Sequence, residues 1–430
     1  MEKHSGYLGL SLIYGGNMIG NLLFAPVIIN WLGAKWSMIL GSSTYAIFIA
    51  GFLFLNYPFL IISSLIIGLG SALIWTAEGS YMALNSTKET SGKQSGLFWA
   101  ISQASLIVGG IFMYIVFRNT KRGENDDLSD STVKILYSVF LGAILVGIVI
   151  LMLLKVPEPA SGVPVPKKDH VQMIKSMFRL LFTKRMLTMA FVFIYVGVEL
   201  SFWSGVYSTC ISNTLKIGDN PKSIVGLTAV AEGCGMFAGG ALFRFLLSKI
   251  KRIPRILVVL LGMVIHLAVF TLVFLNLPNE SPLNKTNDHG VFSEPSVAVV
   301  LICGFFLGFG DACWNTQIYS FLIAEYPNQS AQAFSIYKFF HAMTTCAAFF
   351  WSKYIQLHWH FIILCSTCIW GCFCFFVSER FLSSSYTDVI SPKLEIQIND
   401  KPMDAYNTDT IKDEYLKKHR CSTFGDYDKY

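Results

Sequence analysis

The sequence predicts an all-α, multi-pass membrane protein, and three observations support this. Of the 430 residues, 53% are hydrophobic and only 14% are charged, whereas soluble domains carry roughly 25% charged residues. Apolar runs of about 20 residues, long enough to cross a bilayer as a helix, recur along the chain. Alternating segments typical of a membrane barrel are absent. Because lipid offers no partners to backbone groups, the apolar runs are expected to be helices.

The hydrophobic pattern predicts about eleven spans, each close to the minimum length for a bilayer. Met1 to His4 is a short polar lead, and the first run after it is too long and too interrupted by Gly and Asn for a signal peptide. The expected spans are 6–29, 36–55, 58–82, 95–117, 133–154, 187–211, 222–247, 255–276, 296–323, 331–355 and 359–381.

The charges of the loops predict the orientation. If the spans alternate in direction, the three most basic connections, at 83–94, 155–186 and 248–254, lie on one side, which the positive-inside rule assigns to the cytosol. The N-terminus and the loop at 277–295 then lie on the opposite side. That loop carries two glycosylation sequons, at Asn279 and Asn284, so we expect a glycoprotein, with Pro282 making Asn279 the poorer acceptor.

Composition changes along the chain predict its organisation. The connection at 155–186 is rich in Pro and then basic and amphipathic, as expected of a linker with a surface helix near 168–182. After Phe381 the chain becomes polar, which favours disorder. We therefore expect an N-terminal bundle at 1–154, a cytosolic linker at 155–186, a C-terminal membrane bundle at 187–382 and a disordered cytosolic tail at 383–430.

An internal repeat relates spans that lie six apart. At a fixed offset, Gly68, Gly70, Ala72, Thr76 and Ser80 of the third span match Gly308, Gly310, Ala312, Thr316 and Ser320 of the ninth. The first and seventh spans share a weaker sequence match. Two parallel repeats of six spans indicate the major facilitator fold, with two pseudo-symmetric helical bundles. About 11 of its 12 spans are then present, and the first helix is missing, as in a truncated isoform.

Several segments give the chain a family resemblance. They are LIWTAEG at 73–79 with NS at 85–86, GVELSFWSGVYSTC at 197–210, GFGDACWNTQ at 308–317, and YKFF at 337–340 with LHW at 357–359. The chain resembles the UNC-93-like branch of the major facilitator superfamily over roughly residues 5–381. The resemblance implies a facilitator fold but no substrate, since that branch includes orphan transporter-like proteins, a potassium-channel accessory subunit and a trafficking chaperone for receptors.

Charged residues inside spans are the best candidates for function. Each costs about 2.5–3.5 kcal/mol at mid-membrane, so four would cost on the order of 10 kcal/mol against lipid. They must therefore pair or face a cavity. The candidate cavity or coupling residues are Glu199, Glu232, Asp311, Asn315, Lys338 and His341.

Other readings of these polar residues stay open. A pair between Lys338 and Asp311 could simply hold the C-terminal bundle together. Glu78 is interpreted as a gate or, in preference, as a brace between helices, and His266 as a packing or hydrogen-bonding residue. The facilitator loop signature is degraded, because the segment at 33–37 lacks its acid and its Arg.

Several function classes are excluded. No nucleotide loop, metalloprotease motif or hydrolase elbow is present, so we expect no enzyme, no catalytic residue and no cofactor. The basic residues form no aromatic-interleaved stripe, so nucleic acid is not an expected partner. The cysteines at 365, 368, 372 and 374 lie in one apolar run, where they pack as small apolar residues rather than bind a metal.

Two functions remain. The first is an orphan transporter-like protein with a pathway for a small solute or ion between two bundles, and three buried acids against one fixed base favour coupling to a cation or proton. The second is a non-transporting accessory or trafficking subunit of another membrane protein, such as an ion channel or receptor. The expected partners are the lipid bilayer, an unknown small solute or ion, and a membrane protein. The sequence is compatible with both the plasma membrane and an endomembrane.

Overall fold

The computed structural model describes residues 5–54, 57–119, 130–156, 169–218, 220–249, 254–291 and 294–399. The described regular elements are helical. They are α1 (Ser5–Ile19), η1 (Gly20–Phe24), α2 (Ala25–Leu32), α3 (Ala34–Gly51), η2 (Phe52–Phe54), α4 (Tyr57–Leu84), α5 (Ser91–Asn119), α6 (Asp130–Leu153), α7 (His170–Leu181), α8 (Lys184–Ser201), η3 (Phe202–Tyr207), α9 (Ser208–Asn213), η4 (Leu215–Ile217), α10 (Pro221–Lys249), α11 (Arg255–Asn276), α12 (Val297–Glu325), η5 (Pro327–Gln329), α13 (Ser330–Ser352) and α14 (Leu357–Asn399).

The membrane-spanning character of the chain is confirmed. Within the described residues, eight helices are long and apolar enough to cross a bilayer, and the count rises to nine if the pair α1 and α2, bent by 59°, forms one span. The other two predicted spans are present as helices α3 and α13. Both are richer in polar residues than their neighbours, and the predicted total of eleven spans stays a prediction.

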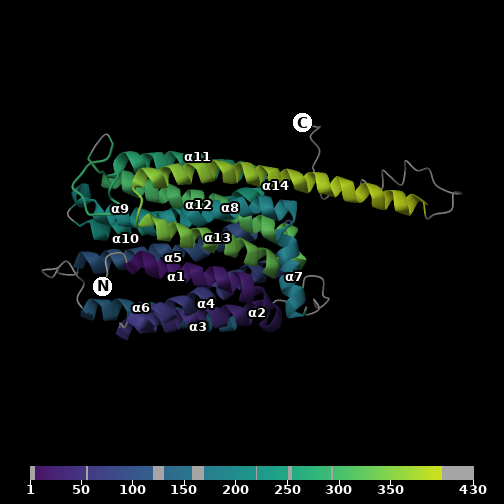
Figure 1. Cartoon of the computed structure of the whole chain (residues 1–430), viewed down its shortest axis with the longest axis horizontal. Helices are drawn as coiled ribbons and strands as arrows, with labels where there is room; N and C mark the ends of the chain where they lie inside the picture. The colour runs from purple at the N-terminus through teal and green to yellow at the C-terminus, as the bar shows by residue number, and fades with distance from the viewer. Residues whose placement is uncertain are drawn as a thin grey trace. The chain divides into compact units, whose positions relative to one another are not determined.

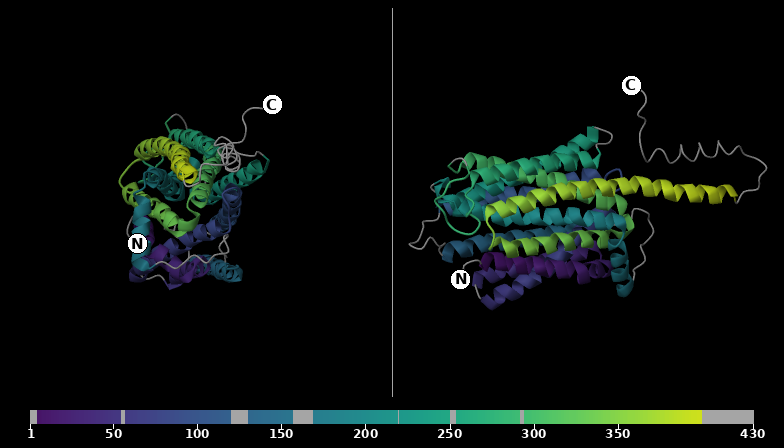
Figure 2. Two further views of the ribbon diagram at one scale, coloured as in Figure 1. Left: turned by 90° about the vertical axis from the view of Figure 1, so that its right-hand side faces the viewer. Right: turned by 45° about the horizontal axis from the view of Figure 1, so that its top comes forward.

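The long helices run side by side in two groups (Figures 1 and 2). In the first group α4 packs against α1 and α3, and α6 packs against α3. In the second group α12 packs against α10 and α11, while α13 packs against α8. The groups meet mainly through two helix pairs, α5 of the first group with α10 and α1 with α13, and also where α12 contacts α5 and α13 contacts α4. Short helix α7 lies across one end of the others (Figure 1).

The sequence repeat corresponds to a repeated helix contact. In the first group the site of a Gly68 Cβ lies 2.4 Å from the Ile13 carbonyl oxygen of α1. In the second group the site of a Gly308 Cβ lies 2.1 Å from the Glu232 carbonyl oxygen of α10. A side chain fits at neither position, so glycine lets the two backbones approach closely, as in many membrane helix pairs. The matching glycines therefore perform the same packing task in both groups.

Two spans are interrupted by π-helical turns. Segment η1 separates α1 from α2, and segment η3 separates α8 from α9. A π turn disturbs the regular hydrogen bonding of the helix and often occurs near functional sites. Segment η3 begins three residues after Glu199, the acid of this span.

Some predicted regions extend beyond the described residues. Residues 120–129 and 157–168 fall in two of the three longest predicted loops and lie outside the described ranges, as do residues 400–430 of the predicted tail. The chain from Glu379 onward forms a second compact unit, in which helix α14 is described as far as Asn399. The domain boundaries inferred from the sequence stay predictions.

The glycine contact gives a testable expectation for stability. Replacing Gly68→Val drives a side chain into the α1 backbone, and such overpacking costs about 1–3 kcal/mol. The midpoint of thermal unfolding in detergent should fall accordingly. Gly142→Val is the matched control, because a Cβ at Gly142 in α6 meets nothing within 4 Å. Equal losses in both variants would contradict close α1–α4 packing.

Candidate functional site

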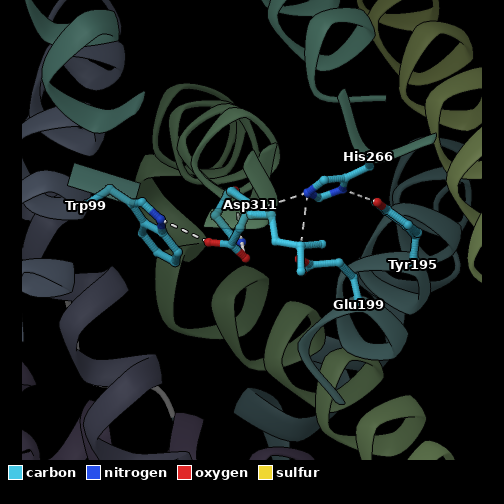
Figure 3. A network of polar contacts seen from close by, with 7 residues as sticks. Trp99, Tyr195, Glu199, His266 and Asp311 are labelled. Carbon is cyan, nitrogen blue, oxygen red and sulfur yellow. Dashed lines mark hydrogen bonds and ion pairs between the residues drawn. The ribbon is translucent and has the colours of Figure 1, made fainter. Parts of the chain in front are cut away.

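Asp311 is the centre of a buried polar network that joins both helix groups (Figure 3). Asn315, one turn further along α12, donates from Nδ2 to Asp311 Oδ1 at 2.8 Å, and Tyr337 of α13 donates to Asn315 Oδ1 at 2.7 Å. From the other group, Trp99 Nε1 of α5 donates to Asp311 Oδ2 at 3.1 Å. Asp311 and Asn315 therefore lie on one face of α12.

Glu199 and His266 extend the network towards α11. His266 is fully buried, its Nδ1 shares a hydrogen bond with the Tyr195 hydroxyl, and its Nε2 lies 3.1 Å from the Leu307 carbonyl oxygen. Glu199 Oε1 lies 3.8 Å from His266 Nε2. A Cβ at Gly310 would fall 2.2 Å from the imidazole, so this glycine makes room for the ring. The expected hydrogen-bonding role of His266 is therefore seen, with Glu199 as a further neighbour.

Lys338 lies among aromatic rings instead of in the suggested direct ion pair with Asp311. In the described part of the chain, its Nζ lies 4.6 Å from the ring centroid of Tyr337, 5.4 Å from that of Trp75 and 5.5 Å from that of Tyr319. Such cation–π contacts offset part of the loss of hydration. Its charge also acts on Glu78 and Asp311.

Glu78 joins the two helix groups. Tyr319 of α12 donates its hydroxyl proton to Glu78 Oε2 of α4 at 3.0 Å. The bond spans the boundary between the groups, which fits the preferred interpretation as a brace and is equally compatible with a gate.

Several carboxylate oxygens lack partners. Neither oxygen of Glu199, nor Oε1 of Glu232, nor Oε1 of Glu78 has a hydrogen-bond donor among the described residues, although all are buried. Glu199 also feels the charges of Asp311 and Glu232. An ionised carboxyl group in this position costs several kcal/mol, so the cluster is suited to hold protons.

The remaining predicted residues lie apart from this cluster or at its edge. His341 is half-buried, with its ring 5.7 Å from that of Tyr337. In the loop after α11, Asn284 is exposed, whereas the side chain of Asn279 donates to Gln356 and accepts from the backbone of His358.

The network lies between a closed end and a cavity. Towards the end where α7 lies, Ser91 and Ser320 share a hydrogen bond of 3.2 Å between the groups, and the Phe334 ring of α13 packs against Gly79 of α4. At the opposite end, a cavity of about 510 Å³ is lined by α1, η3, α9 and α10. Its lining residues are Tyr7, Leu10, Ser204, Gly205, Ser208, Thr209, Ser212, Asn213, Lys222 and Val225.

Comparison with known proteins identifies the family. A family model described as "Ion channel regulatory protein UNC-93" matches residues 1–376. The chain belongs to the UNC-93 family. It is 34% identical over 394 residues to the UNC93-like protein MFSD11 of Xenopus laevis, with 87% of each chain covered.

Solved structures confirm the major facilitator fold of this UNC-93 family protein. The transporter FucP in an outward conformation aligns with a TM-score of 0.61 at 15% identity, covering 89% of this chain and 90% of FucP. The proton:xylose symporter XylE aligns with a TM-score of 0.62 at 14% identity, covering 85% of each chain. At these identities the likeness concerns the fold alone.

The sequence patterns did not single out the aromatic members of the network as functional residues. Trp99, Tyr195, Tyr319 and Tyr337 all place a polar atom on a buried acid, amide or imidazole. The available signal was that Trp and Tyr seek a hydrogen-bond partner when they are buried.

The bond between Trp99 and Asp311 can be tested by stability. Trp99→Phe removes a donor to a carboxylate, and hydrogen bonds to charged groups contribute about 1.5–3 kcal/mol. Trp314→Phe is the matched control, because the buried Trp314 Nε1 has no partner within the described structure. Trp99→Phe should therefore lower the free energy of unfolding more than Trp314→Phe, as followed by denaturation in detergent. Equal effects of the two substitutions would count against this bond between the helix groups.

Proposed function

We propose that this UNC-93 family protein is a secondary transporter that moves a small solute or ion between its two helix groups. Binding of a proton or cation at Glu199, Glu232 and Asp311 drives the movement. The observation that carries the proposal is the excess of buried acid. Glu199, Glu232 and Asp311 are buried and Glu78 is partly buried. Lys338 is the fixed base that acts on Glu78 and Asp311, and four oxygens of Glu78, Glu199 and Glu232 lack donors among the described residues.

The position of the acids supports a role in coupling. Asp311 is bonded to both helix groups through Trp99 and Asn315, so a change in its charge acts on the contact between them. A proton or cation that neutralises Asp311 would weaken the charge-assisted bond from Trp99, since such bonds are roughly twice as strong as neutral ones. Loading of the site would thereby be linked to the separation of the groups.

An unbiased transport assay tests this function. Proteoliposomes containing the full chain are incubated in a pool of small metabolites, with and without an inward proton or Na⁺ gradient, and their contents are identified by mass spectrometry. We expect at least one solute to accumulate in a gradient-dependent manner. Glu199→Gln and Asp311→Asn should abolish that dependence, because an amide side chain neither takes up and releases a proton nor attracts a cation with a negative charge.

The matched control is Glu294→Gln, since Glu294 is a largely exposed loop acid paired with Lys216. It should transport like the unmodified protein. Retained gradient dependence in Glu199→Gln and Asp311→Asn would refute coupling at this cluster.

An accessory role is the second candidate, and the description of the matched family as ion channel regulatory proteins favours it. In this case the chain binds another membrane protein and sets its activity or trafficking. Copurification of a channel or receptor at a fixed stoichiometry, with no solute accumulating in the vesicle assay, would favour this role over transport.

Glycan mapping tests the orientation on which both functions depend. We propose that the N-terminus and the loop after α11 are non-cytosolic and that Asn284 is glycosylated. Asn284→Gln should remove the mobility shift that glycosidase treatment produces, whereas Asn279→Gln should leave it, because the Asn279 side chain is held by Gln356 and His358. A glycan on neither residue, together with cytosolic labelling of the loop, would reverse the proposed topology.

A further inference from the structure

A second cavity lies at the opposite end of the protein from the first. It has a volume of about 630 Å³ and lies where α7 meets the end of α12 and the start of α13. Its lining residues are Ser176, Arg179, Leu180, Thr183, Glu325, Tyr326, Pro327, Asn328 and Gln329. The loop charges assign this end to the cytosol.

Positive charge dominates the surroundings of this cavity. Glu325, which lines it, is nearly buried and is held by two guanidinium groups, Arg185 at 3.0 Å and Arg255 at 3.8 Å. Arg179 is the cation among the lining residues, whereas Arg185 and Arg255 lie next to the cavity through their contact with Glu325. These three guanidinium groups against one carboxylate give the four residues a net charge of plus two. The single acid cannot neutralise the site, so an anion is the expected complement.

Arg185 is held firmly and still has hydrogen-bonding capacity to spare. Its guanidinium lies 4.6 Å from the ring centroid of Phe321 and 6.0 Å from that of Tyr326. Its Nη2 is paired with Glu325, whereas its buried Nε has no hydrogen-bond acceptor within the described structure. Burial raises the pKa of Tyr326, which keeps its hydroxyl protonated. Phosphate oxygens are acceptors that suit the fork geometry of Arg.

Helix α7 has the character of a helix that lies in a membrane interface. One side is buried through Met173, Met177 and Leu180. The outer side exposes Val171 and Phe182, about 70% accessible each, beside the exposed cations of Lys175 and Arg179. Apolar side chains interleaved with basic ones bind acyl chains and anionic headgroups together. The cavity therefore opens next to a surface suited to lipid.

We propose that this cavity binds the phosphate-bearing headgroup of an anionic phospholipid of the cytosolic leaflet. Arg179, the cation that lines the cavity, contacts the phosphate, and the outer side of α7 contacts the acyl chains. The site is separate from the buried acids, and it does not depend on whether the protein transports. Because α7 precedes α8 and the cavity joins it to α12 and α13, bound lipid would clamp the linker helix to the second helix group.

Thermal unfolding of the full chain in nanodiscs tests the site. Discs of pure phosphatidylcholine are compared with discs that include phosphatidylserine. Phosphatidylserine should raise the unfolding midpoint by about 3 °C or more, as expected for a ligand that binds only the folded state. Arg179→Gln should lose most of this shift, and Arg179 is exposed, so the variant should fold.

The control is Lys134→Gln, which removes one exposed cation from α6 and should respond to phosphatidylserine like the unmodified protein. Inorganic phosphate added to phosphatidylcholine discs should give little shift, because it makes no acyl contacts. A full shift from inorganic phosphate would assign the site to a free anion and overturn the lipid. An unchanged response in Arg179→Gln, or an equal loss in Lys134→Gln, would overturn the site itself.

Discussion

The bond between Trp99 and Asp311 shows the constraint on which the rest of the structure depends: a charge placed inside the bilayer must be held by another part of the protein. Asp311 reaches donors on α5 and α12, and Lys338 replaces water with three aromatic rings. These partners belong to both helix groups, so the same residues that make the acids tolerable also hold the groups together. Without close packing of the backbones, such short side-chain bonds could not reach across the boundary.

Glycine supplies that close packing. At the α5–α10 contact, the Cβ sites of Gly96 and Gly240 lie 2.8 and 2.7 Å from each other's carbonyl oxygens, and Gly110 meets Gly226 in a similar way further along. In lipid, where apolar burial gives no net drive for helices to associate, small residues allow the van der Waals contact that does. The glycine contacts therefore bring the helix backbones close enough for the polar network to form.

The sequence predicts the general design well, because that design has local signals. Span length, loop charge and the match of Gly68 with Gly308 are all visible without coordinates, and they lead to the facilitator fold. The acids could be identified as well, since a charge within an apolar run has few explanations. Their partners could not. Trp99 and Asp311 are 212 residues apart, Tyr319 and Glu78 are 241 apart, and no periodicity connects residues at such separations. The sequence suggested a pair of Lys338 with Asp311 because both are charges inside apolar runs. It could not show that aromatic rings surround the lysine.

The two kinds of contact between the helix groups differ in what it costs to break them. The bonds of Ser91 with Ser320 and of Tyr319 with Glu78 lie towards the closed end, and that of Trp99 with Asp311 lies deeper. Each depends on a proton position or a charge. The glycine contacts of α5 with α10 are apolar, continue to the other end and respond to neither. A movement that opened the closed end would therefore separate the polar bonds first and could keep the glycine contacts as its pivot. Neutralising Asp311 would weaken its bond to Trp99 and leave the glycine contacts unchanged, and under the proposed function this is how one buried acid biases such a movement.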